Sequence, residues 1–147
     1  GTYALSLTAG DAVCEQEFQL LADPRFLDQG TSLEDMAAQE YFQLLVVDLV
    51  SEVRRFEEQV EEEAEVLEGK KELSPEETAR LEAVKGILER IQSADIIYPR
   101  PMLTSQVSYL YNMVSRADQA PGSEANKRLD TLSAELAELR TMYESGD

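Results

Sequence analysis

The longest stretch of the chain with a single periodicity runs from Thr31 to Gly69 and reads TSLEDMAAQEYFQLLVVDLVSEVRRFEEQVEEEAEVLEG. Thr31 followed by Glu34 has the form of a capping box, and Gly69 is a typical C-terminal cap. The pattern predicts one helix over residues 32–68, which would be about 50 Å long. Its apolar residues recur in steps of three and four, as in an amphipathic helix: Leu33, Met36, Ala37, Tyr41, Leu44, Leu45, Leu49, Val53, Phe56, Val60, Ala64 and Leu67.

The two halves of this predicted helix differ in composition. In the first half the apolar residues lie on more than one side, as where Val46 and Val47 stand beside Leu44. We therefore expect the first half to be well buried and the second half to project into solvent. The second half carries glutamates around a thin apolar stripe: Glu57, Glu58, Glu61, Glu62, Glu63, Glu65 and Glu68.

Three further helices are predicted, over residues 75–94, 102–117 and 123–145. Ser74, Pro75 and Glu77 form a complete helix start, with an N-cap, a proline at the first helical position and a capping box. The predicted fold class is therefore mainly α, a four-helix antiparallel bundle over residues 32–147 that follows a linker at residues 23–31. The last helix has a strict three-four seam: Leu129, Leu132, Leu136, Leu139 and Tyr143.

Residues 1–22 have a different period and predict a β-hairpin. Tyr3, Leu5 and Leu7 alternate with small or polar residues, and Gly10-Asp11 occupies the tip of a two-residue turn. Folding back on this tip sets Tyr3 opposite Phe18, so most apolar side chains share one face. A lone two-stranded hairpin is marginally stable in water. We therefore expect the end of a truncated β domain, packed on the helices or on a second copy.

The chain is strongly acidic, with 30 Asp and Glu against 13 Lys and Arg in 147 residues and a formal charge of −17. A nucleic-acid partner is not expected, because binding phosphates requires clustered cations. No apolar run approaches the roughly 18–20 residues of a membrane span. The acidity has two explanations that remain open: a solvated helical face, or adaptation to high salt.

The residue types of most catalytic and metal sites are missing. The chain has no histidine and one cysteine, Cys14, which excludes Ser-His-Asp and Cys-His catalysis, zinc sites built on histidine or thiolates, and internal disulfides. Cys14 itself is expected to be a small buried hydrophobe. Carboxylate pairs such as Glu58 and Glu62 would lie on a wet convex surface, where no general acid works at neutral pH. We predict no catalytic residues, no metal and no cofactor.

One cluster of residues is a candidate for recognition. Tyr98, Arg100, Tyr109 and Tyr111 surround a proline-flanked connection, and Tyr and Arg are frequent interface anchors. The competing interpretation, which we favour, is that Tyr98 and Arg100 hold the connection onto the bundle. The candidate interface residues are thus Tyr3, Leu5 and Phe18 in the hairpin, with Tyr98 and Arg100 as a second group.

The chain carries a series of short motifs: Gly1–Leu7, Asp23–Arg25, Tyr98–Leu103, Gln106, Tyr109–Tyr111 and Ala117–Gly122. Together they resemble the C-terminal region of bacterial sortilin-like proteins, which are BNR-repeat β-propellers often labelled glycosyl hydrolases. In that family an immunoglobulin- or fibronectin-like β unit closes with such a strand pair and an Asp-Pro-Arg exit, before a helical tail. The resemblance spans nearly the whole chain.

The resemblance implies that any catalytic or ligand-binding surface lies on a propeller outside this chain, and it transfers no functional residue. It also implies an extracytoplasmic location, since the family is commonly exported. We expect a non-catalytic C-terminal accessory module of a larger β-propeller protein, whose partners are the preceding β domains and, through the hairpin, a second copy. The alternative is a free-standing acidic helical adaptor that binds a protein partner. A carboxylate-based hydrolase is a remote third.

Overall fold

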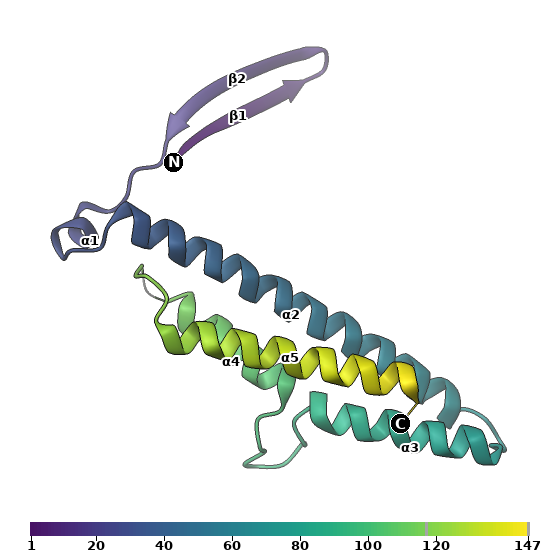
Figure 1. The fold of residues 1–147 in the computed structure, drawn as a ribbon. Helices are drawn as coiled ribbons and strands as arrows, with labels where there is room; N and C mark the ends of the chain where they lie inside the picture. The colour runs from purple at the N-terminus through teal and green to yellow at the C-terminus, as the bar shows by residue number, and fades with distance from the viewer. Residues whose placement is uncertain (117, 147) are drawn as a thin grey trace.

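The computed structural model describes residues 1–116 and 118–146, and it shows a helical bundle preceded by a β-hairpin, as predicted (Figure 1). The elements are β1 (Thr2–Ala9), β2 (Ala12–Gln19), α1 (Pro24–Asp28), α2 (Leu33–Glu68), α3 (Pro75–Ile91), α4 (Leu103–Val114) and α5 (Ser123–Ser145). The predicted bounds are accurate for α5. Both α2 and α4 begin one residue later than predicted, and both α3 and α4 end three residues earlier. Residue 117, the predicted end of the third bundle helix and part of one resemblance motif, lies outside the described residues.

The short helix α1 occupies the predicted linker at residues 23–31. Asp23 is its N-cap and accepts a hydrogen bond from the backbone N–H of Arg25 at 2.9 Å, and Pro24 fills the first turn. An aspartate followed by a proline is a strong helix start. We expected Asp23-Pro24 only to end the strand, and it also begins this helix.

The N-terminus of α2 lies one residue later than predicted. Ser32, not Thr31, is the N-cap: its Oγ accepts from the backbone N–H of Asp35 at 3.0 Å, and the Asp35 carboxylate accepts from the Ser32 N–H at 2.9 Å. Both Thr31 and Ser32 have an acidic residue three positions later, so the capping pattern alone does not distinguish the two starts.

Within the bundle, α3 and α4 follow one another along α2, and α5 lies against all three helices (Figure 1). Side-chain contacts show which part of α2 each helix covers. Gln39 in the first half of α2 donates to the backbone oxygen of Val114 in α4, whereas Glu63 in the second half binds Arg80 in α3. α5 runs antiparallel to this pair, since Arg128 binds Gln106 of α4 and Glu138 binds Arg90 of α3. Each cross-section of the bundle therefore contains α2, α5 and either α3 or α4.

One core cluster runs the length of the bundle and draws on α2, α3, α4 and α5. The predicted seams are buried in it, including Leu103, Val107, Leu110 and Val114 of α4 and Leu132, Leu136 and Leu139 of α5. The buried residues of α2 are Phe42, Val46, Leu49, Val53, Phe56, Val60, Ala64 and Leu67.

The expectation for the two halves of α2 is wrong. The second half does not project into solvent, because α3 folds back along it and buries Val60, Ala64 and Leu67. Residues 33–41, at the start of the first half, contribute nothing to the buried core, and side chains such as Leu44 face solvent. The short connection from α2 to α3 places α3 on the glutamate-rich half, where Arg80 and Lys85 pair with Glu63 and Glu68.

Candidate functional site

The hairpin forms with the predicted register. Tyr3 pairs with Phe18, Leu5 with Gln16 and Leu7 with Cys14, and the Tyr3 and Phe18 rings stack with centroids 5.7 Å apart. Gly10, at the turn, has φ 61°, a left-handed conformation that costs glycine nothing. At the open end, the N-terminal amine of Gly1 donates to the Leu20 oxygen at 2.7 Å. The paired segment therefore extends over residues 1–20.

Every residue of both strands is exposed to solvent, including the predicted interface residues Tyr3 (47%), Leu5 (63%) and Phe18 (49%). These three lie on one side of the sheet with Leu7 and Cys14, and we call these five residues the hairpin apolar face. The hairpin stands apart from the bundle and is joined to the N-terminal end of α2 through α1 (Figure 1).

Packing of Tyr3, Leu5 and Phe18 on the helices is therefore a wrong expectation, and so is burial of Cys14. The physical reason is that the four helices already bury one another's apolar seams, while α1 and its flanking turns lie between the hairpin and the bundle. No described helix covers the hairpin apolar face.

Both strands are also edge strands, because the sheet in the described residues contains only β1 and β2. Each strand leaves the backbone N–H and C=O groups of every second residue without a ladder partner, and such an edge is a template for a further strand. The hairpin thus offers two surfaces at once, an apolar face and two open edges.

The second predicted group lies in the connection between α3 and α4, residues 92–102. Tyr98 is 91% exposed and its neighbour Ile97 is 88% exposed, so Tyr98 does not hold the connection onto the bundle. Ser93 does this instead: its Oγ accepts from the Met102 N–H at 3.0 Å and lies 2.8 Å from the Ser105 Oγ. The favoured interpretation of Tyr98 is therefore wrong, because short polar groups at the two ends of the connection fasten it.

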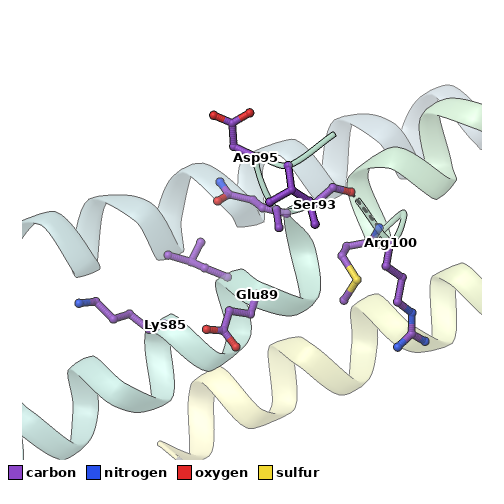
Figure 2. Close-up of a pocket in the computed structure, with 10 residues that line it drawn as sticks. Lys85, Glu89, Ser93, Asp95 and Arg100 are labelled. Carbon is purple, nitrogen blue, oxygen red and sulfur yellow. Dashed lines mark hydrogen bonds between the residues drawn. The ribbon is translucent and has the colours of Figure 1, made fainter. Parts of the chain in front are cut away.

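A shallow cavity of about 740 Å³ lies between this connection and α3, with Leu88 and Met102 among its apolar lining (Figure 2). Figure 2 shows that the side chains of Asp95 and Arg100 extend in opposite directions. The other two charged groups of the lining, Lys85 and Glu89, both belong to α3, and Lys85 is paired with Glu68 at 2.5 Å. The charged groups around this cavity therefore do not converge on one point, as the groups of a catalytic site must.

The two remaining tyrosines of the predicted cluster face different ways. Tyr109 lines a hollow with Arg100 and Arg128, whereas Tyr111 lines another with Val47 and Val50 of α2. Arg100 and Tyr109 thus line one cavity together, whereas Tyr111 lines another.

A surface that the sequence interpretation missed lies along the first half of α2. Leu33, Tyr41 and Leu44 are 65%, 65% and 58% exposed and follow one another at helical spacing. The sequence did contain a sign of this surface, because apolar residues lie on more than one side of the first half of α2. We interpreted these additional apolar residues as a sign that the whole first half is buried, whereas α4 and α5 cover only one side of the helix.

The carboxylates with shifted pKa values belong to structural contacts. A hydrogen bond from Lys70, helped by the Ser74 N–H, lowers the pKa of Glu77 to about 2. Hydrogen bonds from Arg80 likewise lower the pKa of Glu63. General acids need the opposite shift, upward toward neutral pH, so these groups serve to stabilise the fold.

No family model matches the chain, and no curated protein or solved structure is significantly similar to it. Among the residues that the structure describes, no helix is long and apolar enough to span a membrane, and no group of three potential metal ligands comes together.

Proposed function

We propose that this chain is a protein-interaction module that docks through its hairpin apolar face onto a β domain. The observation that carries the proposal is the exposure of all strand residues in a two-stranded sheet. A hairpin of this size is marginally stable alone, and large apolar side chains gathered on one exposed face are typical of interaction surfaces.

A β domain is the favoured partner because the hairpin presents the geometry that sheets recognise. Its apolar face can pack on another sheet, and its open edges can extend one. The resemblance to sortilin-like proteins supports the same partner, since in that family such a strand pair closes an immunoglobulin- or fibronectin-like unit. On this proposal the partner belongs to the same parent protein, and the helical bundle is a non-catalytic accessory to it.

The reading frame upstream of Gly1 is the first test. A frame that encodes β-rich domains supports the proposal. A start codon and signal peptide directly before Gly1 would contradict it and favour the free-standing adaptor, which would then bind through the exposed stripe of Leu33, Tyr41 and Leu44 on α2.

If the hairpin apolar face docks, a double substitution on that face should lower the affinity for the β domain. With the upstream β domain supplied as a separate purified protein, we expect Leu5→Ser with Phe18→Ser to weaken binding at least about tenfold, because two apolar anchors are lost from the contact. Titration calorimetry measures the affinity. The matched control is Ser6→Ala with Thr8→Ser on the opposite face of the hairpin, which should bind as the unmodified chain does.

Equal affinity of both variants would show that the hairpin apolar face does not dock. Because the hairpin is marginal, amide chemical shifts must first show that each variant keeps the β1–β2 pairing. A variant of Tyr41 and Leu44 that alone loses binding would assign the function to the stripe on α2 instead.

Without a partner, the unpaired hairpin is expected to promote self-association. Two hairpins can pair edge to edge or pack their apolar faces together, so we expect a concentration-dependent dimer through residues 2–20. Light scattering at increasing concentration measures the mass, and Leu5→Ser with Phe18→Ser should shift the dimer toward monomer. A monomer at millimolar concentration would contradict this expectation.

A further inference from the structure

Two arginines of this acidic chain, Arg100 and Arg128, line the same cavity. The seven ion pairs found among the described residues use Arg25, Lys70, Arg80, Lys85, Arg90, Lys127 and Arg140. Neither Arg100 nor Arg128 pairs with a carboxylate of residues 1–116 or 118–146. Arg54, Arg55 and Lys71 also form no ion pair there, and what distinguishes Arg100 and Arg128 is that they line one cavity together.

The cavity has a volume of about 590 Å³ and lies where the connection before α4 meets α4 and α5. Its lining residues are Arg100, Pro101, Ser105, Gln106, Tyr109 and Arg128. No carboxylate is among them. Potential donors therefore come from two guanidiniums, two hydroxyls and an amide, and the apolar surface comes from a proline and a tyrosine ring.

The geometry of this cavity is held by polar contacts across elements. Gln106 donates from its Nε2 to the Pro101 oxygen at 2.9 Å, and its Oε1 accepts from the Arg128 guanidinium. Gln106 thus connects the loop, α4 and α5. In Figure 2 the Arg100 side chain extends from the connection toward α5, the helix that carries Arg128.

We propose that this cavity binds an oxyanion, a phosphate or carboxylate group, attached to an aromatic ring. The guanidiniums of Arg100 and Arg128 hold the oxyanion, because planar forks of N–H donors match such groups bidentately. Tyr109, which is 71% exposed, and Pro101 provide a flat wall for the ring.

The overall charge of −17 does not prevent this binding. At physiological ionic strength the screening length is about 8 Å, so the potential inside the cavity is set by the groups that line it. The same argument predicts weaker binding as salt is raised, since the site is open to solvent.

The test is a titration of the full ¹⁵N-labelled chain, followed by amide and arginine Nε–H shifts in 0.15 M NaCl. The probes are phenyl phosphate, benzoate and inorganic phosphate. We expect saturable shifts at Ser105, Gln106, Tyr109 and Arg128 with phenyl phosphate or benzoate, and tighter binding of these than of inorganic phosphate.

The pocket variant Arg100→Gln with Arg128→Gln should lose at least about tenfold in affinity, because both charged donors are removed. The matched control, Arg54→Gln with Arg55→Gln, removes the same two charges from exposed positions on α2 and should bind unchanged. Tyr109→Ala should abolish the preference for the aromatic probes over inorganic phosphate.

Shifts that do not saturate with any probe, or equal losses in the pocket and control variants, would overturn the site. Inorganic phosphate that binds as tightly as phenyl phosphate would overturn the role of Tyr109 and Pro101 as a wall for an aromatic ring. Because all the substituted residues are exposed, circular dichroism should show that every variant keeps its helices.

Discussion

Replacing Leu139 with alanine is expected to lower the free energy of unfolding by about 3–4 kcal/mol, the largest single-residue effect predicted for this chain. Leu139 lies in α5, is fully buried and belongs to the core cluster shared by the four long helices. The truncation removes buried apolar surface and leaves a cavity that rigid neighbouring helices can only partly close. Urea unfolding followed by circular dichroism measures the change.

The matched control is Leu44→Ala in α2. The chemistry of the change is the same, but Leu44 is 58% exposed, so the cost should stay below about 1 kcal/mol. For a chain of this size the Leu139 variant should also melt about 10 °C lower. Similar losses at Leu139 and Leu44 would contradict the packing of α5 described above.

Replacing Arg80 with alanine is expected to cost about 2 kcal/mol, more than an ordinary surface ion pair. Arg80 in α3 binds both carboxylate oxygens of Glu63 in α2, at 2.7 and 2.8 Å, and donates to the backbone oxygen of Tyr143 in α5 at 2.7 Å. Its guanidinium also lies 4.5 Å from the centre of the Tyr143 ring. One side chain therefore joins three helices.

The contrast with Arg140 separates this network from simple charge removal. Arg140 makes one hydrogen bond to Glu52, at 3.0 Å, and both side chains of that pair are more than 40% exposed. Arg140→Ala should cost less than about 1 kcal/mol. Arg80→Lys should recover only part of the loss, because an ammonium group cannot reproduce the bidentate contact.

The contribution of Arg80 is expected to depend on pH in a defined direction. Hydrogen bonds from Arg80 lower the pKa of Glu63 below its usual value of 4.5, so the folded chain keeps this carboxylate ionised where the unfolded chain protonates it. The stabilisation is therefore complete above that value and is lost as the pH falls through the lower folded pKa.

The readout is the difference in unfolding free energy between the unmodified chain and Arg80→Ala, measured from pH 7 to pH 3. Acidification also relieves repulsion among the many carboxylates, but it does so in both proteins, so that effect largely cancels in the difference. A difference that stays constant down to pH 3 would show that Glu63 is not the partner through which Arg80 stabilises the fold.

Local patterns in the sequence were sufficient for the hairpin and the four long helices. The alternation around Tyr3 and Leu5 predicted the hairpin register, and the Ser74-Pro75 start predicted the first residue of α3. Errors arose where two local patterns were equally good, as for the N-cap of α2 at Thr31 or Ser32. The helix in the linker was missed because Pro24 was considered only as the end of a strand.

The candidate surfaces were predicted less well. Tyr98 is a residue type that often anchors connections, yet Ser93 does this and Tyr98 faces solvent. The sequence could not show that Arg100 and Arg128 line one cavity. Residues 101–127 lie between them in the chain, and only the packing of α5 against α4 brings them together.

The sequence by itself thus determined the hairpin, the four long helices and the apolar seam of each, because period, caps and turns act between residues a few positions apart. Only the tertiary structure decided which apolar faces stay uncovered and which distant side chains meet. Both depend on where each helix lies on its neighbours. The folded chain alone therefore shows that the hairpin apolar face and the outer stripe of α2 stay uncovered, and that Arg100 and Arg128 meet at one cavity.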